Sequence, residues 1–274
     1  MDRETGAAVS RSPRIRLSVL VLAAAGCATL GPDEGIDWIT TAGPGFTLAT
    51  AEQDRALIPE LLAWGSSGRA DVEAFFGRSF RSHFVVRVFP DRASLVAYWV
   101  GVWHAPSLDD GCGAVAAARG REITYLSPAA WPTDACGLDA GSNQGAVILT
   151  HELVHVLHEH WNPRLGEVAH AIPWFVEGLA VYASGQLRRD YAGRVKAAVV
   201  TGQAPTSLED FWMDSLRYGL AGSMVAYLDI RLGRRGLDRL LTALTLTDIL
   251  TAVGGSKADL LVGWRTYVAT GSSG

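Results

Sequence analysis

The sequence HELVH at residues 151–155 constrains this chain more than any other feature, because it predicts a helix and a metal site together. An apolar run precedes it and Pro163 follows it, which is typical of a helix that ends before a proline. On a helix, His151 and His155 lie one turn apart and project from the same face. Two such imidazoles can bind one zinc ion, and Glu152 beside them can take a proton from a water bound to that ion.

Glu177 is the expected third ligand. It is the acidic residue of a second predicted helix, Phe175 to Leu187, whose other residues are largely apolar. A buried carboxylate in such surroundings needs a charge partner or a metal ion to compensate it. With His151 and His155 it would complete a His, His, Glu ligand set and leave the fourth position open, as catalytic zinc sites do.

Three other histidines follow closely in the sequence: His158, His160 and His170. The metzincin arrangement places glycine and a third histidine three and six residues after the second motif histidine, but His158 and Trp161 occupy those positions. One helix cannot readily place three ligands around a tetrahedral ion, so we expect His158 and His160 at the surface or at the helix end. His170, in a predicted loop, is the alternative third ligand.

The HELVH segment together with WFVEGLAVY at residues 174–182 resembles the gluzincin metallopeptidases, and more narrowly the bacterial peptidase-MA-like family. The segment YGLAGSMVAYL at residues 218–228 resembles the next helix of that family. The resemblance covers roughly residues 75–270, and only the two metal segments are specific. It implies a zinc metallopeptidase with one Zn²⁺ per chain and a peptide or protein substrate.

The implied fold is α+β: a small mixed sheet, an active-site helix and a mainly helical C-terminal half. One position departs from the resemblance, since Val181 stands where thermolysin-type enzymes have an acidic residue near the ligands. A ligand histidine normally donates its second ring nitrogen to such a partner, so the group that orients the imidazoles stays open.

For the reaction we expect Glu152 to act as the base and then to protonate the leaving amine. Tyr218 is the expected oxyanion donor, because it opens the helix that follows the glutamate helix and matches the resembling segment. A packing role for Tyr218 is the alternative, with Arg217 or Tyr182 as the donor. Tyr182 is five residues from Glu177 and points away from that face, which favours packing.

The N-terminus predicts export from the cytoplasm. Arg11, Arg14 and Arg16 precede an apolar run at residues 17–25 that is too short to span a bilayer, and Ala-Gly-Cys closes it. We predict a signal peptide at residues 1–26, a lipidated Cys27 that anchors the protein to a bacterial membrane at the periplasm or cell surface, and a tether over residues 27–45. A secretory signal with an incidental cysteine is the alternative.

Cys112 and Cys136 then remain as an even pair in an oxidising compartment, and we predict a disulfide between them. It would close a hairpin at residues 114–126, with a contribution of about 3 kcal/mol in the chain-entropy model. The first hairpin strand, rich in alanine, would expose its backbone to an extended peptide, as gluzincin edge strands do. Packing of these alanines beneath a helix is the alternative.

The rest of the chain is predicted to form one domain, residues 46–270. We expect a helix over residues 51–77 with breaks at Pro59 and Gly65, a strand over residues 83–89, and a helix cap at Asp91. Two further caps are predicted, at Ser207 and Ser256. Four tryptophans are predicted either to line a pocket or to belong to the core: Trp99, Trp103, Trp131 and Trp161.

Composition and the motif together narrow the function. A net charge of −4 and a pI near 6 provide no basic field for nucleic acid, and nothing indicates an oligomeric state. A zinc metallopeptidase outside the cytoplasm is the leading hypothesis. The alternatives are a zinc hydrolase of another amide, for example in the cell wall, and a lipoprotein that binds zinc without turnover. Glu152 argues against the last, since a structural site needs no base.

Overall fold

The structure is a computed structural model, and it describes residues 35–108, 113–135, 143–168 and 171–271. The chain divides into Met1–Leu30 and Gly31–Gly274, and all described residues belong to the second unit. Several predicted features lie outside the described residues: the signal peptide, the lipidated Cys27, the disulfide between Cys112 and Cys136, and the alternative ligand His170.

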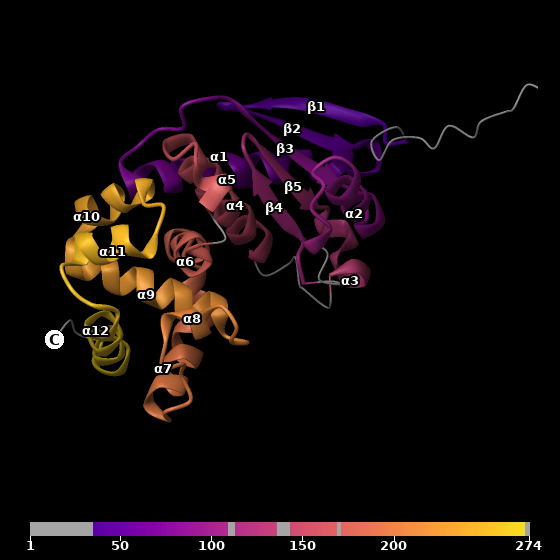
Figure 1. Cartoon of the computed structure of the whole chain (residues 1–274). Helices are drawn as coiled ribbons and strands as arrows, with labels where there is room; N and C mark the ends of the chain where they lie inside the picture. Colours follow the sequence, from indigo (N-terminus) through magenta and orange to yellow (C-terminus); the bar gives the residue numbers. More distant parts are fainter. Residues whose placement is uncertain (1–34, 109–112, 136–142, 169–170, 272–274) are drawn as a thin grey trace, which may run out of the picture. The chain divides into compact units, whose positions relative to one another are not determined.

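A five-stranded mixed sheet forms one side of this unit (Figure 1). Its strands are β1 (Trp38–Gly43), β2 (Phe46–Ala51), β3 (Phe84–Phe89), β4 (Ala116–Arg119) and β5 (Glu122–Leu126), in the order β1-β2-β3-β5-β4. The β2–β3 and β3–β5 pairs are parallel, and the two outer pairs are antiparallel. The predicted mixed sheet is therefore confirmed, and β4 lies at one edge of it.

The tether predicted over residues 27–45 is wrong at its C-terminal end. Residues 38–43 form strand β1, which pairs with β2 from Trp38↔Ala51 to Gly43↔Phe46. Gly45 makes the tight turn between the two strands with a φ of +79°, a conformation that favours glycine. We interpreted the Gly, Thr and Pro of this segment as linker composition, but they belong to a hairpin.

The predicted hairpin at residues 114–126 is confirmed as β4 and β5, which pair from Ala116↔Tyr125 to Arg119↔Glu122. Gly120 turns the chain with a φ of +63°. The first strand begins at Ala116, two residues later than its predicted start.

Two helices cover one face of the sheet: α1 (Ile58–Phe76) and α4 (Gln144–Trp161), which pack against each other. The Tyr125 hydroxyl of β5 donates to the Gly145 carbonyl at 3.0 Å and ties the sheet to the start of α4. The opposite face is covered by α2 (Arg92–Gly101), whose Trp99 donates its indole N–H to Thr124 Oγ1 at 2.8 Å. Asp91 caps α2 by accepting from the Ser94 amide, as predicted.

Helix α1 has no break at Gly65, so this prediction is wrong. Pro59 lies in the first turn, where backbone amides make no hydrogen bond within the helix, so its missing N–H does not break α1. Gly65 lies against the ring of Phe46, and a Cβ there would come within 2.7 Å of Phe46 Cζ. The glycine therefore permits the close approach of α1 to β2.

The part of the chain after residue 143 is helical, as predicted. Besides α4, its helices are α5 (Leu165–Val168), α6 (Pro173–Ala183), α7 (Ala192–Val200), α8 (Leu208–Phe211), α9 (Arg217–Leu232), α10 (Arg234–Arg239), α11 (Leu246–Val253) and α12 (Lys257–Thr270). A short helix, α3 (Trp131–Asp134), precedes α4. Helix α6 ends earlier than predicted, and a π-helical turn, Leu187–Tyr191, follows it. The caps at Ser207 and Ser256 are confirmed. No helix among the described residues has the length and apolar character needed to cross a bilayer.

Helices α6 and α9 pack more closely than the other helix pairs (Figure 1). A Cβ on Gly178 would lie 2.5 Å from the carbonyl oxygen of Ala221, and a Cβ on Gly222 would lie 2.5 Å from Val181 Cγ1. Only glycine at these two positions permits the observed helix separation, which places the start of α9 beside the residues of α6.

His158 lies in the last turn of α4, one of its two expected positions, but it is not at the surface. It is fully buried in the core and interacts through Nε2 with the Leu241 carbonyl at 2.9 Å. Burial lowers the pKa of His158 to about 3, since the core disfavours the imidazolium. His160 lies at the helix end, as predicted, with Nε2 2.9 Å from Ser82 Oγ.

We predict that His158 destabilises the folded chain in acid. The pKa of His158 is about 3 when folded and 6.5 when unperturbed, so the unfolded chain binds the extra proton as the pH falls below about 6.5. The free energy of unfolding is therefore not reduced by His158 above about pH 6.5, and it should be lower by about 2 kcal/mol at pH 5. His158→Leu should be less stable than the wild type at pH 8, where the Leu241 carbonyl lacks its donor.

That deficit should shrink at pH 5, because leucine does not titrate. The measurement is urea unfolding of both metal-free proteins at the two pH values. A deficit of equal size at pH 8 and pH 5 would contradict the assignment.

Candidate metal centre

The three predicted ligands come together where α6 crosses α4. His151 and His155 project from the same face of α4, and Glu177 of α6 meets them. The His155 Nε2–His151 Nε2 distance is 3.1 Å, and Glu177 Oε2 lies 3.3 Å from His151 Nε2 and 3.5 Å from His155 Nε2. Ligand atoms about 2.0–2.1 Å from a tetrahedral zinc ion are separated by about 3.3 Å. The spacing of the three atoms therefore fits a single tetrahedral ion.

The orientation of His151 also suits a metal ligand. Its Nδ1 lies 2.8 Å from Gln186 Oε1 and can donate to this oxygen. Its Nε2 faces the Glu177 carboxylate at 3.3 Å. A divalent metal between these two atoms would be bound by both of them, so the donor set fits such an ion.

Gln186 is a residue that the sequence did not reveal. It takes the place of the acid that we noted as missing at residue 181, because Val181 is fully buried against Gly222 of α9 and has no room for a charge. Gln186 opens the π-helical turn that follows α6. Such turns are frequent at functional sites, but no sequence pattern marked this one.

The charges of the site are strongly coupled. Burial raises the pKa of the Glu177 carboxyl, but His155 and His151 outweigh burial and hold this pKa below its usual range. Burial lowers the pKa of His155, but the charge of Glu177 and its hydrogen bond prevail and raise it to about 9. The carboxylate and the two imidazoles thus stabilise each other's charge in the absence of an ion.

Glu152 lies beside the ligands and has a different environment. Its side chain is buried, and its carboxylate accepts a hydrogen bond from the backbone of Ala118 in β4. Burial raises the pKa of Glu152. A carboxyl group whose pKa lies closer to neutrality can both take up and release a proton near neutral pH.

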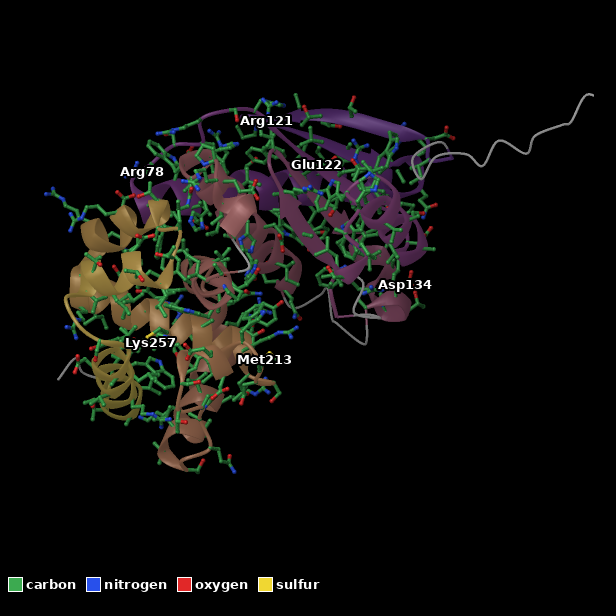
Figure 2. All side chains as sticks on the ribbon, in the orientation of Figure 1. Arg78, Arg121, Glu122, Asp134, Met213 and Lys257 are labelled. Carbon is green, nitrogen blue, oxygen red and sulfur yellow. The ribbon has the colours of Figure 1, made fainter. Side chains whose placement is uncertain are left out.

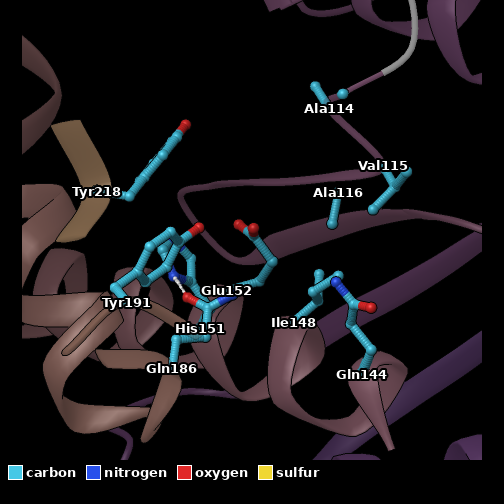
Figure 3. Close-up of a pocket in the computed structure, with 11 residues that line it drawn as sticks. Ala114, Val115, Ala116, Gln144, Ile148, His151, Glu152, Gln186, Tyr191 and Tyr218 are labelled. Carbon is cyan, nitrogen blue, oxygen red and sulfur yellow. Dashed lines mark hydrogen bonds between the residues drawn. The ribbon is translucent and has the colours of Figure 1, made fainter. Parts of the chain in front are cut away.

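A cleft runs along β4 over the three ligands. Figure 3 shows one part of it, in which Ala114, Val115 and Ala116 face Tyr191, Tyr218 and Gln186 across His151 and Glu152. Among the described residues β4 is an edge strand of the sheet, the position at which an extended segment can add to a sheet. The alanines of the hairpin line this cleft, which agrees with the first of the two roles considered for them.

The three candidate donors have different positions. Tyr218 lines the cleft, and its ring centre is 6.5 Å from that of His151. Arg217 lies with its guanidinium 5.3 Å from the Tyr218 ring centre. Tyr182 instead donates to Asp229 Oδ2 at 2.9 Å and packs against Phe75, as expected for a packing residue. Tyr191, which we had not considered, also lines the cleft.

The four tryptophans belong to the packing of the domain. Trp99, Trp103 and Trp131 are buried in the core. Trp161 is sandwiched by two guanidinium groups, Arg78 at 4.0 Å and Arg81 at 3.5 Å from its ring centre. Arg78 of this cluster is labelled in Figure 2.

We predict that Gln186→Ala weakens metal binding by about 10–100-fold, because His151 loses the acceptor that fixes its tautomer. The affinity is measured by competition with a chromogenic chelator at pH 7.5. Gln186→Glu, which keeps an acceptor, should bind the metal at least as tightly as the wild type. Gln203→Ala, an exposed amide outside the cleft, is the matched control. Equal affinities for all four proteins would exclude the proposed role of Gln186.

The sequence matches no family model and no curated protein. Among solved structures it is similar to a variant of a two-domain M1 zinc metallopeptidase bound to L-arginine, with 14% identity over 87% of this chain and a TM-score of 0.48. An M1 zinc metallopeptidase variant from Deinococcus radiodurans gives 16% identity, 84% of this chain and a TM-score of 0.48. A structure of an M1 zinc metallopeptidase from Deinococcus radiodurans is also similar, with 14% identity over 84% of this chain and a TM-score of 0.45. The chain spans about half the length of these proteins, covering 53%, 52% and 51% of them.

Proposed function

We propose that this chain is a zinc-dependent metallopeptidase. The observation that carries the proposal is the tetrahedral spacing of His151, His155 and Glu177, with the buried carboxylate of Glu152 beside them. A structural zinc site is usually closed by four protein ligands, whereas the described part of the chain supplies three, and they lie open to a cleft. The edge strand β4 beside it offers backbone groups to an extended peptide.

When bound, zinc would lower the pKa of a coordinated water and polarise the substrate carbonyl. Glu152 accepts the proton of the attacking water, and its burial favours a subsequent transfer to the leaving amine. Gln186 holds His151 in the ligating tautomer. Tyr218 donates a hydrogen bond from its hydroxyl to the oxyanion, and burial raises the pKa of Tyr218, which keeps the phenol protonated.

We further propose that the enzyme acts outside the cytoplasm. The arginine-led apolar segment that ends at Cys27 supports export and lipidation, and Cys112 and Cys136 support a disulfide that forms there.

The first test is the metal content and peptidase activity of purified residues 28–274. We predict about one zinc per chain in the wild type and in Glu152→Gln, because the base is not a ligand. Glu177→Ala should lose the metal. Glu152→Gln should lower kcat by several orders of magnitude, since it cannot take the proton. Wild-type protein without zinc after reconstitution, or undiminished hydrolysis by Glu152→Gln, would refute the proposal.

A second test assigns the oxyanion donor. Tyr218→Phe should lower kcat by about 100-fold with little change in KM, because the lost hydrogen bond forms in the transition state. Tyr191→Phe lacks a hydroxyl in the same cleft and is the matched control. The loss of kcat in Tyr191→Phe alone would transfer the role to Tyr191.

A further inference from the structure

The cleft continues past the metal ligands to a single acidic side chain, Glu159. On α4, Glu159 lies one turn beyond His155, as His155 lies one turn beyond His151, so all three project from the same face. Glu159 Oε2 accepts a hydrogen bond from the Gly120 amide in the turn between β4 and β5. The carboxylate is therefore held between the end of the edge strand and the end of the active-site helix.

The walls between His155 and Glu159 are apolar. Leu108, Leu165 and Val176 line this part of the cleft together with the alanines of β4. Apart from the metal ligands and Glu152, Glu159 is the one charged residue among the described residues that line it. An apolar channel that ends at a carboxylate suits a ligand with a methylene stem and a cationic tip.

Among the described residues, burial outweighs the groups that favour the Glu159 carboxylate. Burial raises the pKa of Glu159, although the Gly120 amide, His155 and Arg119 act against this. The guanidinium of Arg119 itself donates its NH1 to the Trp103 carbonyl. A cation from a ligand would therefore be favourable at this carboxylate.

The direction of a bound peptide follows from β4. The start of β4 lies with Gln144 and Ile148 near the beginning of α4, and its end lies with Glu159 near the end of α4. An extended peptide that pairs with β4 in the more stable antiparallel sense has its N-terminal side at Glu159. Four helical residues span about 6 Å from His155 to Glu159, the length of about two residues of extended chain.

We propose that Glu159 is a specificity-determining residue that binds a cationic group of the substrate, about two residues before the scissile bond. This inference rests on the proposed peptidase function. The cation is the ammonium or guanidinium of a lysine or arginine side chain, or the free amino terminus of a peptide that begins there.

The test compares internally quenched peptides that carry lysine, arginine or norleucine at each of three positions before the scissile bond. Norleucine has the lysine stem without its charge. With N-acetylated peptides, zinc-loaded wild type should cleave the lysine or arginine peptide with a kcat/KM about tenfold or more above the norleucine peptide at one position. Neutral peptides with a free or an acetylated N-terminus form the second arm, and a preference for the free amine identifies the terminus as the cation.

Glu159→Gln keeps an oxygen acceptor for the Gly120 amide and removes the charge. It should abolish the preference and leave cleavage of acetylated norleucine peptides, zinc content and Tm close to those of the wild type. Glu159→Lys should favour glutamate at the same position, which keeps the inference testable if the first variant misfolds. Glu52→Gln, an exposed residue paired with Arg55, makes the same change in net charge outside the cleft and should retain the preference.

Cleavage of the norleucine peptides without any preference for a cationic group would overturn the inference and leave the peptidase function standing. A preference that persists in Glu159→Gln would also overturn it. If zinc-loaded wild type cleaves no peptide, the proposed function fails and the inference fails with it.

Discussion

The half-buried carboxylate of Glu177, facing two imidazoles, is the interaction on which the rest of the site depends. The carboxylate lies 3.3 Å from Nε2 of His151, close enough for both groups to bind one cation. A metal ion bound there would join α4 to α6. Metal binding is therefore expected to contribute to the stability of this part of the fold as well as to its chemistry.

The close packing of α6 and α9 sets the geometry of the centre. Glycines at residues 178 and 222 allow the two helices to approach, which brings Tyr218 at the start of α9 towards His151. The same packing buries Val181 and leaves no space for an acid there, so Gln186 supplies the partner of His151 from the next turn. The sheet contributes the other wall, because β4 lies at its edge directly beside α4.

The cleft is asymmetric about the three ligands. One end has two tyrosines and glutamine side chains, and the other has apolar walls that end at Glu159. If a peptide binds along this strand edge, each end of the cleft contacts a different side of the scissile bond. Glu159 at the apolar end is then available for substrate selection without taking part in the chemical step.

Local patterns accounted for the features that depend on neighbouring residues. The helix around HELVH, the hairpin at residues 114–126 and the caps at Asp91, Ser207 and Ser256 all follow from spacing, glycine or capping side chains. The predictions for Gly65 and for residues 38–43 were wrong, because their structures depend on contacts with Phe46 and with strand β2. The burial of His158 was not predicted, because its partner, the Leu241 carbonyl, is distant in sequence.

The sequence by itself determined the mixed α+β character, the helix that carries His151 and His155, and the place of Glu152 beside them, since helical periodicity places these side chains. It nominated Glu177 as an acid in an apolar helix and Tyr218 by resemblance, but the folded chain alone shows how close they lie to the histidines. Gln186, Tyr191 and Glu159 emerged only from the tertiary structure. Their positions beside the site depend on how α4, α6, α9 and β4 pack, and packing between distant segments leaves no periodic pattern in a single sequence.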